Sequence, residues 1–298
     1  MQKDPTEGRG MIYFSLLMAA LGTSHLLITS ESGDLYGLGA IDILLGTKRN
    51  PHDSAELEKI EGAQNVVKVA AARSHAACID SSGHLLLFGN LNWATLICSL
   101  FHSPQPDVWF ESVSCGQWGI IAVDCGGRMW GIGLNDHGQL GFSSKQFQAT
   151  ELTLIDSMEK PVLDACCGFY YSLCLTEDKG AYVFGSSSEI SLYSNNEGIS
   201  GIVLPTKLPI DNVDAISMTH FLSEGHIYDT NLYEMSCDPP LDRNANFDNV
   251  VTMYAGYGKV IGVEGDCTFR IDGIGSSIEI PDEFINVYKR GHRCRRNS

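Results

Sequence analysis

Short apolar runs separated by glycine-containing turns recur along most of the chain. Around residue 75, three such runs occupy residues 66–72, 76–79 and 84–88, and a turn that closes with Gly83 separates the last two. Apolar runs of this length bounded by turn residues are typical of buried strands, and Gly83 can take the positive φ that a tight hairpin requires. The pattern predicts a unit of three strands followed by a connector.

The unit is repeated with an unchanged internal spacing. Four copies share an anchor residue, a turn position and a closing glycine. The anchors are Gly22, Ala72, Gly116 and Gly168; the turn positions are Gly33, Gly83, Gly127 and the pair Lys179-Gly180; the closing glycines are Gly39, Gly89, Gly133 and Gly185. Extending an apolar column through Val213, Val250 and Ile285 predicts further anchors at Thr219, Gly256 and Gly291, with Tyr233 in an aromatic column of the fifth unit.

Repetition of this kind predicts an all-β fold, a β-propeller of about six to seven blades, because each sheet can bury its faces only against its neighbours. The predicted limits are a leader at 1–10, the propeller at 11–288 and a basic tail at 289–298. The last anchor has no hairpin after it in the sequence. We therefore expect an incomplete last blade, which offers a strand edge for pairing with a partner.

One run carries a specific resemblance. The third unit reads Trp-Gly-Ile-Gly-Leu-Asn-Asp-His-Gly-Gln-Leu-Gly over residues 130–141. It resembles the repeat signature of the regulator-of-chromosome-condensation family, in which a strand ending in aromatic-x-Gly is followed by Asn-x-x-Gly-Gln-Leu-Gly. The Cys-Gly pairs at 115–116 and 167–168, together with His25 and His75, are similar to other parts of that repeat. The resemblance is strong over residues 12–185 and weak from there to about residue 291.

The resemblance implies a seven-bladed propeller and a set of residues that serve the repeat. These are Gly22, His25, Gly33, His75, Gly83, Gly116, Gly127, Gly133, Gln139 and Gly168. It also implies a choice of functions, since many members of the family are scaffolds or trafficking factors. The founding member is a nucleotide exchange factor for the Ran-type small GTPase and binds chromatin. The wedge on which that exchange activity depends has no matching insertion in this sequence.

The charge of the chain narrows the choice of partners. The formal net charge is −16 at pH 7, so the chain as a whole repels phosphate and lacks the basic footprint of a nucleic-acid binder. A basic protein partner is favoured instead. The exception is the tail, a candidate nuclear-localisation or anionic-surface patch, which carries Lys289, Arg290, Arg293, Arg295 and Arg296.

Cysteine usage indicates a cytoplasmic and/or nuclear protein. The chain has ten cysteines but neither a Cys-x-x-Cys pair nor an Asn-x-Ser/Thr sequon, which favours a reducing compartment. Residues 11–28 are apolar enough to suggest a signal peptide or membrane span, but the repeat accounts for this segment. We therefore expect no membrane association, and the sequence leaves the oligomeric state open.

No motif in the sequence predicts catalysis, a metal or a cofactor. His25 and His75 share one repeat column, and Cys115 and Cys167 share another, which favours structural roles for all four. Metal-ligand spacings, phosphate-binding loops and nucleophile motifs are absent from the sequence.

We predict a non-enzymatic scaffold or adaptor that binds a protein partner through its disc face and its connector loops. The alternative is a guanine nucleotide exchange factor for a Ran-type small GTPase. The candidate contact residues are Asn92, Trp93 and Trp109 in or beside a connector, Asp136 and His137 after a strand of the third unit, and Lys289, Arg290, Arg293, Arg295 and Arg296 of the tail.

Overall fold

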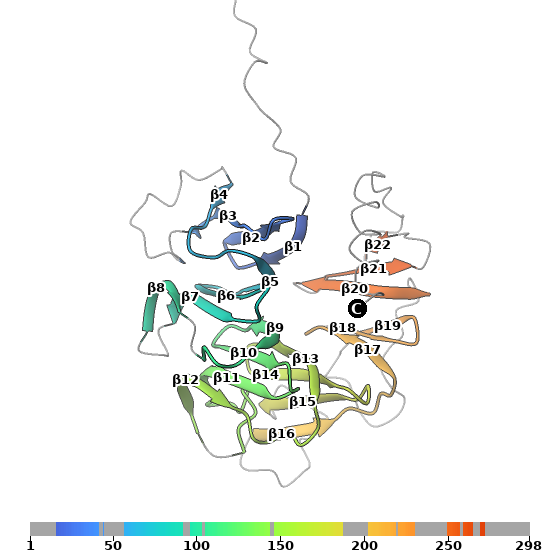
Figure 1. Ribbon diagram of the computed structural model, residues 1–298. Coiled ribbons are helices and arrows are strands. Elements are labelled where there is room, and N and C mark those ends of the chain that lie inside the picture. Colours follow the sequence, from blue (N-terminus) through green and yellow to red (C-terminus); the bar gives the residue numbers. More distant parts are fainter. Residues whose placement is uncertain are drawn as a thin grey trace, which may run out of the picture.

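Six antiparallel sheets follow one another around a central axis in the computed structural model (Figure 1). The residues that the structure describes are 16–41, 44, 57–91, 96–102, 105–143, 146–186, 202–218, 220–229, 249–256, 259–264 and 269–271. Strands and turns account for nearly all of them, which confirms the all-β prediction. The six described sheets are consistent with a propeller of six to seven blades. The limits predicted at residues 11 and 288, the leader and the tail lie outside the described residues.

Within each blade the strands are ordered from the axis outward as they occur in the chain. Blade one contains β1 (Leu16–Leu21), β2 (His25–Ser30), β3 (Leu35–Gly39) and β4 (Glu58–Lys59). Blade two contains β5 (Val66–Ala71), β6 (His75–Asp80), β7 (Leu85–Leu91) and β8 (Leu96–His102). Blade three contains β9 (Phe110–Cys115), β10 (Gly119–Asp124), β11 (Met129–Leu134) and β12 (Gln148–Leu154).

The remaining blades continue the same order. Blade four contains β13 (Val162–Cys167), β14 (Tyr171–Thr176), β15 (Ala181–Ser186) and β16 (Ile202–Lys207). Blade five contains β17 (Val213–Ile216), β18 (His220–Ser223) and β19 (His226–Asp229). Blade six contains β20 (Val250–Gly256), β21 (Lys259–Glu264) and β22 (Phe269–Ile271).

The connectors of the first four units contribute a fourth, outermost strand to each blade, where the repeat pattern predicted three strands and a connector. The outer strand β12 shows why the pattern missed it. Of its residues, Ala149 and Leu152 are buried while most of the others are exposed. An outer strand of this kind covers the rim of the sheet and carries no continuous apolar run.

The fifth unit is shorter than the sequence register assumed, so the anchor predicted at Thr219 is wrong. In blades one to four the anchor N–H donates to the carbonyl three residues later, as Gly22 does to His25 at 2.9 Å. In blade five the same bond joins Ser217 to His220, at 2.8 Å. The hairpin turns at Gly225, which has a φ of +79°. Position 256 does pair as the register predicted, with Lys259, whereas Tyr233, Ile285 and Gly291 lie outside the described residues.

One backbone contact joins each described blade to the next. The carbonyl of a turn residue with positive φ accepts a hydrogen bond from the first residue of the following inner strand. The five bonds are Val66 to Gly33 (2.8 Å), Phe110 to Gly83 (2.7 Å), Val162 to Gly127 (2.9 Å), Val213 to Lys179 (3.0 Å) and Val250 to Gly225 (2.9 Å). The turn column of the repeat therefore marks the junctions between blades.

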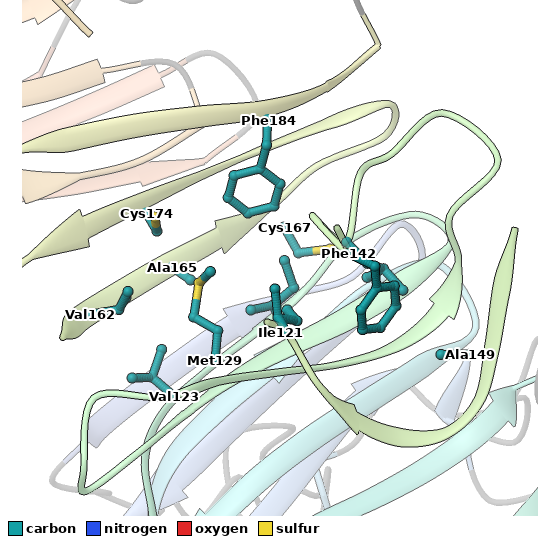
Figure 2. Close-up of a cluster of buried hydrophobic side chains, with 12 residues drawn as sticks. Ile121, Val123, Met129, Phe142, Ala149, Val162, Ala165, Cys167, Cys174 and Phe184 are labelled. Carbon is teal, nitrogen blue, oxygen red and sulfur yellow. The ribbon is translucent and has the colours of Figure 1, made fainter. Parts of the chain in front are cut away.

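Buried side chains fill each described junction. The middle strand β10 is buried along its whole length, because it packs against a neighbouring blade on either side. Figure 2 shows the cluster between blades three and four, where Val123 and Met129 lie across from Val162 and Phe184. Similar clusters join the other neighbouring blades from one to six. The core is thus a series of interfaces between sheets.

Replacing Gly127 with alanine is expected to lower the free energy of unfolding by about 1–3 kcal/mol, the cost of a strained left-handed residue. Gly127 has a φ of +74°, and an added Cβ would lie 2.8 Å from the Cβ of Pro161 in the next blade. Chemical denaturation of the purified protein measures the effect.

The matched control is Gly126→Ala in the same turn. The φ of Gly126 is not in the left-handed region, and a Cβ there would meet the ends of the Asp124 and Arg128 side chains, the nearer at 3.3 Å. Equal losses of stability in the two variants would contradict the role assigned to the junction.

Candidate protein-binding surface

The disc has two faces with different loops. One side carries the loops between the first and second strands of each blade, together with the loop after β11, and we call it the anchor face. The opposite side carries the tight turns between the second and third strands, and we call it the turn face. In an antiparallel sheet, loops on alternate connections lie at opposite ends of the strands. The repeat thereby separates the candidate residues into two groups.

Glycines of the anchor column lie where the backbones of neighbouring blades touch. A methyl group added at Gly22 would overlap the carbonyl oxygen of Ala72, and one at Gly116 would overlap the carbonyl oxygen of Gly168. A methyl group at Gly168 would in turn overlap the side chain of Met218. The close approach of the chains leaves no room for a side chain at these positions.

The repeated histidines are buried beside the same contacts. A Cβ at Gly22 would overlap the His25 ring, and burial lowers the pKa of His25. His75 is fully buried. Burial lowers its pKa to about 4, an effect that the carbonyls of Gly119 and Gly116 in the next blade oppose and the nearby His25 reinforces. These rings are neutral at physiological pH and lie at junctions between blades.

Buried His220 occupies the same column in blade five. His220 was not predicted from the sequence, because the predicted fifth anchor lies two residues too late. The signal was the histidine itself, three residues after Ser217.

Three cysteine thiols are also held in the core, those of Cys78, Cys167 and Cys174. Burial raises the pKa of Cys167 to about 11, and it raises those of Cys78 and Cys174 to about 12. The thiol of Cys167 donates to the carbonyl of Gly119 at 3.6 Å. These thiols have little thiolate character at neutral pH. Among the described residues, no group of three or more His, Cys, Asp or Glu could hold a metal ion.

The loop after β11 is fixed by buried polar residues of the signature. Asn135 accepts a hydrogen bond from the Leu140 N–H at 2.8 Å, and Gln139 accepts one from the His137 N–H at 3.0 Å. Both amide side chains are buried. Asp136 and His137 are left at the surface of the anchor face, where the His137 Nδ1 lies 3.0 Å from the Asp136 Oδ1.

Three exposed aromatic residues lie beside this loop. Trp118 belongs to the anchor loop of blade three, and Phe169 and Tyr170 belong to that of blade four. The two loops touch, because the Gln117 N–H donates to the Gly168 carbonyl at 3.3 Å. The His137 ring lies against the Tyr170 ring with 4.7 Å between centroids. We call Trp118, His137, Phe169 and Tyr170 the aromatic patch.

The exposed area of this patch is large for aromatic side chains. Phe169 is 58% exposed, Tyr170 is 38% exposed and Trp118 is 37% exposed. Trp118, Phe169 and Tyr170 were not predicted as contact residues from the sequence. The available signal was the run Phe-Tyr-Tyr at 169–171, directly after an anchor glycine, where the first two units have Thr-Ser-His and Arg-Ser-His.

The other candidates do not join this group. Trp109 is 57% exposed but lies on the turn face, where its Cβ would be 3.0 Å from a methyl group added at Gly83. Asn92, Trp93 and the basic tail residues lie outside the described residues. Of the predicted contact residues that the structure describes, Asp136 and His137 are brought together and Trp109 is separate.

The geometry defines a β-propeller whose blades meet through a repeated turn and a repeated anchor. No profile of a known protein family matches the chain. The regulator of chromosome condensation from Xenopus laevis is 22% identical over 207 residues, which cover 61% of this chain and 49% of the relative. The regulator of chromosome condensation from Homo sapiens is 26% identical over 200 residues, which cover 58% and 48%. This chain therefore spans about half the length of these curated relatives.

Solved structures agree on the fold. Human WBSCR16 superposes with a TM-score of 0.71 at 16% identity, covering 86% of this chain and 76% of that one. Yeast Prp20 bound to Kap60 gives a TM-score of 0.67 at 16% identity, covering 89% and 74%. The chain therefore has a β-propeller fold, which is similar to the folds of these solved structures. Among the described residues, no helix has the length and apolar character needed to cross a membrane.

The buried histidine makes stability depend on pH. His75 has a pKa of about 4 when folded, against 6.5 for an ordinary histidine, so between these values the unfolded chain binds a proton that the folded chain does not. The contribution of His75 to stability is therefore present above pH 6.5 and is lost as the pH falls toward 4. From about pH 7 to about pH 5, His75 is expected to account for a loss of about 2 kcal/mol.

Denaturation at the two pH values compares the wild type with His75→Gln, which should lose less stability on acidification. His84→Gln removes a partly exposed histidine at a surface turn and serves as the control. An unchanged pH dependence in His75→Gln would contradict the prediction.

Proposed function

We propose that this propeller is a non-enzymatic interaction module that binds a protein partner through the aromatic patch on its anchor face. The observation that carries the proposal is the patch itself, in which Trp118, Phe169 and Tyr170 remain exposed on loops held by buried contacts. Aromatic side chains on a rigid support are the usual centres of binding energy in protein interfaces. The patch gives the predicted scaffold or adaptor a specific docking position.

A cytoplasmic and/or nuclear location belongs to the same proposal. Six cysteines of the described residues are free thiols, as expected in a reducing compartment. The excess of acidic residues favours a basic partner and an association that weakens with salt. The basic tail remains a second candidate contact within this proposal.

The second candidate function is nucleotide exchange on a Ran-type small GTPase. What favours it is the similarity to the regulator of chromosome condensation and to yeast Prp20p, a protein described with its binding to Gsp1p and histones. A fold supports many functions, so this similarity carries less weight than a site. Because the candidate residues lie on two separate faces of the disc, variants on each face can show which face the GTPase contacts.

Loss of the aromatic patch is expected to remove the partner without unfolding the propeller. In the variant Trp118→Ser, Phe169→Ser, Tyr170→Ser, the recovery of a specific co-purified protein should fall at least about tenfold, since interface anchors of this type contribute more than about 1 kcal/mol each. Quantitative mass spectrometry of tagged protein from cells measures the recovery. Trp109→Ser, which removes an equally exposed aromatic from the turn face, should leave it unchanged. Equal recovery with the triple variant and the wild type would refute the proposal.

Exchange activity is tested by the release of a fluorescent guanine nucleotide from a Ran-type GTPase. The proposed interaction module leaves release at its spontaneous rate at every concentration of the chain. Acceleration that grows with concentration would establish the second function instead. The triple variant and Trp109→Ser would then show which face the GTPase contacts.

A further inference from the structure

The aromatic patch has a carboxylate at its border. Asp136 is the second residue after the end of β11, and its side chain is 51% exposed. The Asp136 Oδ1 accepts from the Gln139 amide at 3.3 Å and lies 3.0 Å from the His137 Nδ1. Both side-chain contacts reach the same oxygen, so Oδ2 remains for a further side-chain donor. The carboxylate is thereby fixed in position one ring away from Tyr170.

Asp136 is held in its charged form. Partial burial raises its pKa, but the hydrogen bonds from His137 and Gln139 outweigh burial, and the pKa of Asp136 lies below its ordinary value. A negative charge and two partly exposed aromatic side chains, Trp118 and Tyr170, are thus carried by neighbouring loops of the anchor face. The aromatic faces carry partial negative charge as well. The area is suited to a cation that also has a flat apolar surface.

We propose that the aromatic patch and Asp136 bind an arginine side chain presented by the protein partner. The inference rests on the proposed function and names the chemistry of its docking site. A planar guanidinium group can stack on an aromatic side chain and donate a hydrogen bond to the remaining Oδ2 of Asp136, whereas an ammonium group is a compact, strongly hydrated charge that does not stack. The net charge of −16 favours the approach of such a basic segment.

Binding of a short fluorescein-labelled peptide tests the proposal. The probe has three arginines in a glycine–serine background, and two companion peptides carry lysine or citrulline at the same positions. Citrulline keeps the shape of the side chain and removes its charge. Fluorescence anisotropy with the full chain should show the tightest binding for arginine, weaker binding for lysine and the weakest for citrulline. Equal binding of the arginine and citrulline peptides would overturn the proposal.

Two variants of the patch each remove one part of the site. Asp136→Asn and Tyr170→Leu are each expected to weaken binding of the arginine peptide by about three- to tenfold. Because both side chains are partly exposed, the variants should remain folded, and thermal unfolding checks this. Asp178→Asn and Trp109→Leu are the matched controls, since they remove an exposed carboxylate and an exposed aromatic from the turn face. Losses as large in the controls as in the patch variants would mean that net charge alone attracts the peptide.

One competing occupant is the basic tail of the same chain. A variant of the same chain addresses it, in which glutamine replaces each of Lys289, Arg290, Arg293, Arg295 and Arg296. If the tail occupies the patch, these changes should raise the affinity for the arginine peptide more than about tenfold, and the assignment to a partner would be wrong. A smaller change supports a partner.

Failure of the inference can be told apart from failure of the proposed function. If the triple patch variant loses its cellular partner but the arginine peptide does not bind, the docking surface stands and its arginine chemistry is wrong. If neither depends on the patch, both proposals fail.

Discussion

The structure depends on one backbone hydrogen bond repeated between neighbouring blades. A turn residue in the left-handed conformation directs its carbonyl at the first residue of the next inner strand. The bond requires a positive φ, and the next strand passes so close that glycine is the natural residue at Gly33, Gly83 and Gly127. Lys179 is the residue at the corresponding turn position of blade four, where a side chain is present. Its φ is +59°, and its exposed ammonium forms a 2.7 Å ion pair with Asp214 of the following blade.

On the anchor face the blades are joined by a different contact. There the anchor glycines let neighbouring backbones touch, and buried histidines lie beside these contacts. The two sets of contacts hold each blade at both ends of its inner strand, and apolar clusters such as that of Figure 2 fill the space between. Relative positions of neighbouring loops are therefore set by the frame and not by the loops themselves. A surface built from three loops, as the aromatic patch is, requires this rigidity to keep its members in place.

Much of the fold could be predicted from the sequence because the junctions between blades use glycine, which recurs at the same position of each repeat. The fourth strand was missed because a rim strand such as β12 has little buried surface and no apolar run. The fifth unit was misplaced because its hairpin is shorter and the closing glycine column is lost. For the candidate site, Asp136 and His137 could be predicted from the signature, whereas Phe169 and Tyr170 could not. Their meeting with His137 depends on contacts between blades that no single repeat contains.

The residues of the proposed contact surface depart from the repeat. Corresponding anchor-loop positions carry Ser24 and Ser74 in the first two blades but Trp118 and Tyr170 in the next two. At these positions the backbone carbonyl accepts a hydrogen bond from within the same blade, as the Trp118 carbonyl does from the Leu134 N–H at 2.8 Å. This bond does not depend on the side chain, so the repeat permits an aromatic residue there, and part of its side chain is exposed. Its apolar area becomes useful when a partner covers it, at about 25 cal/mol for each Å² removed from water.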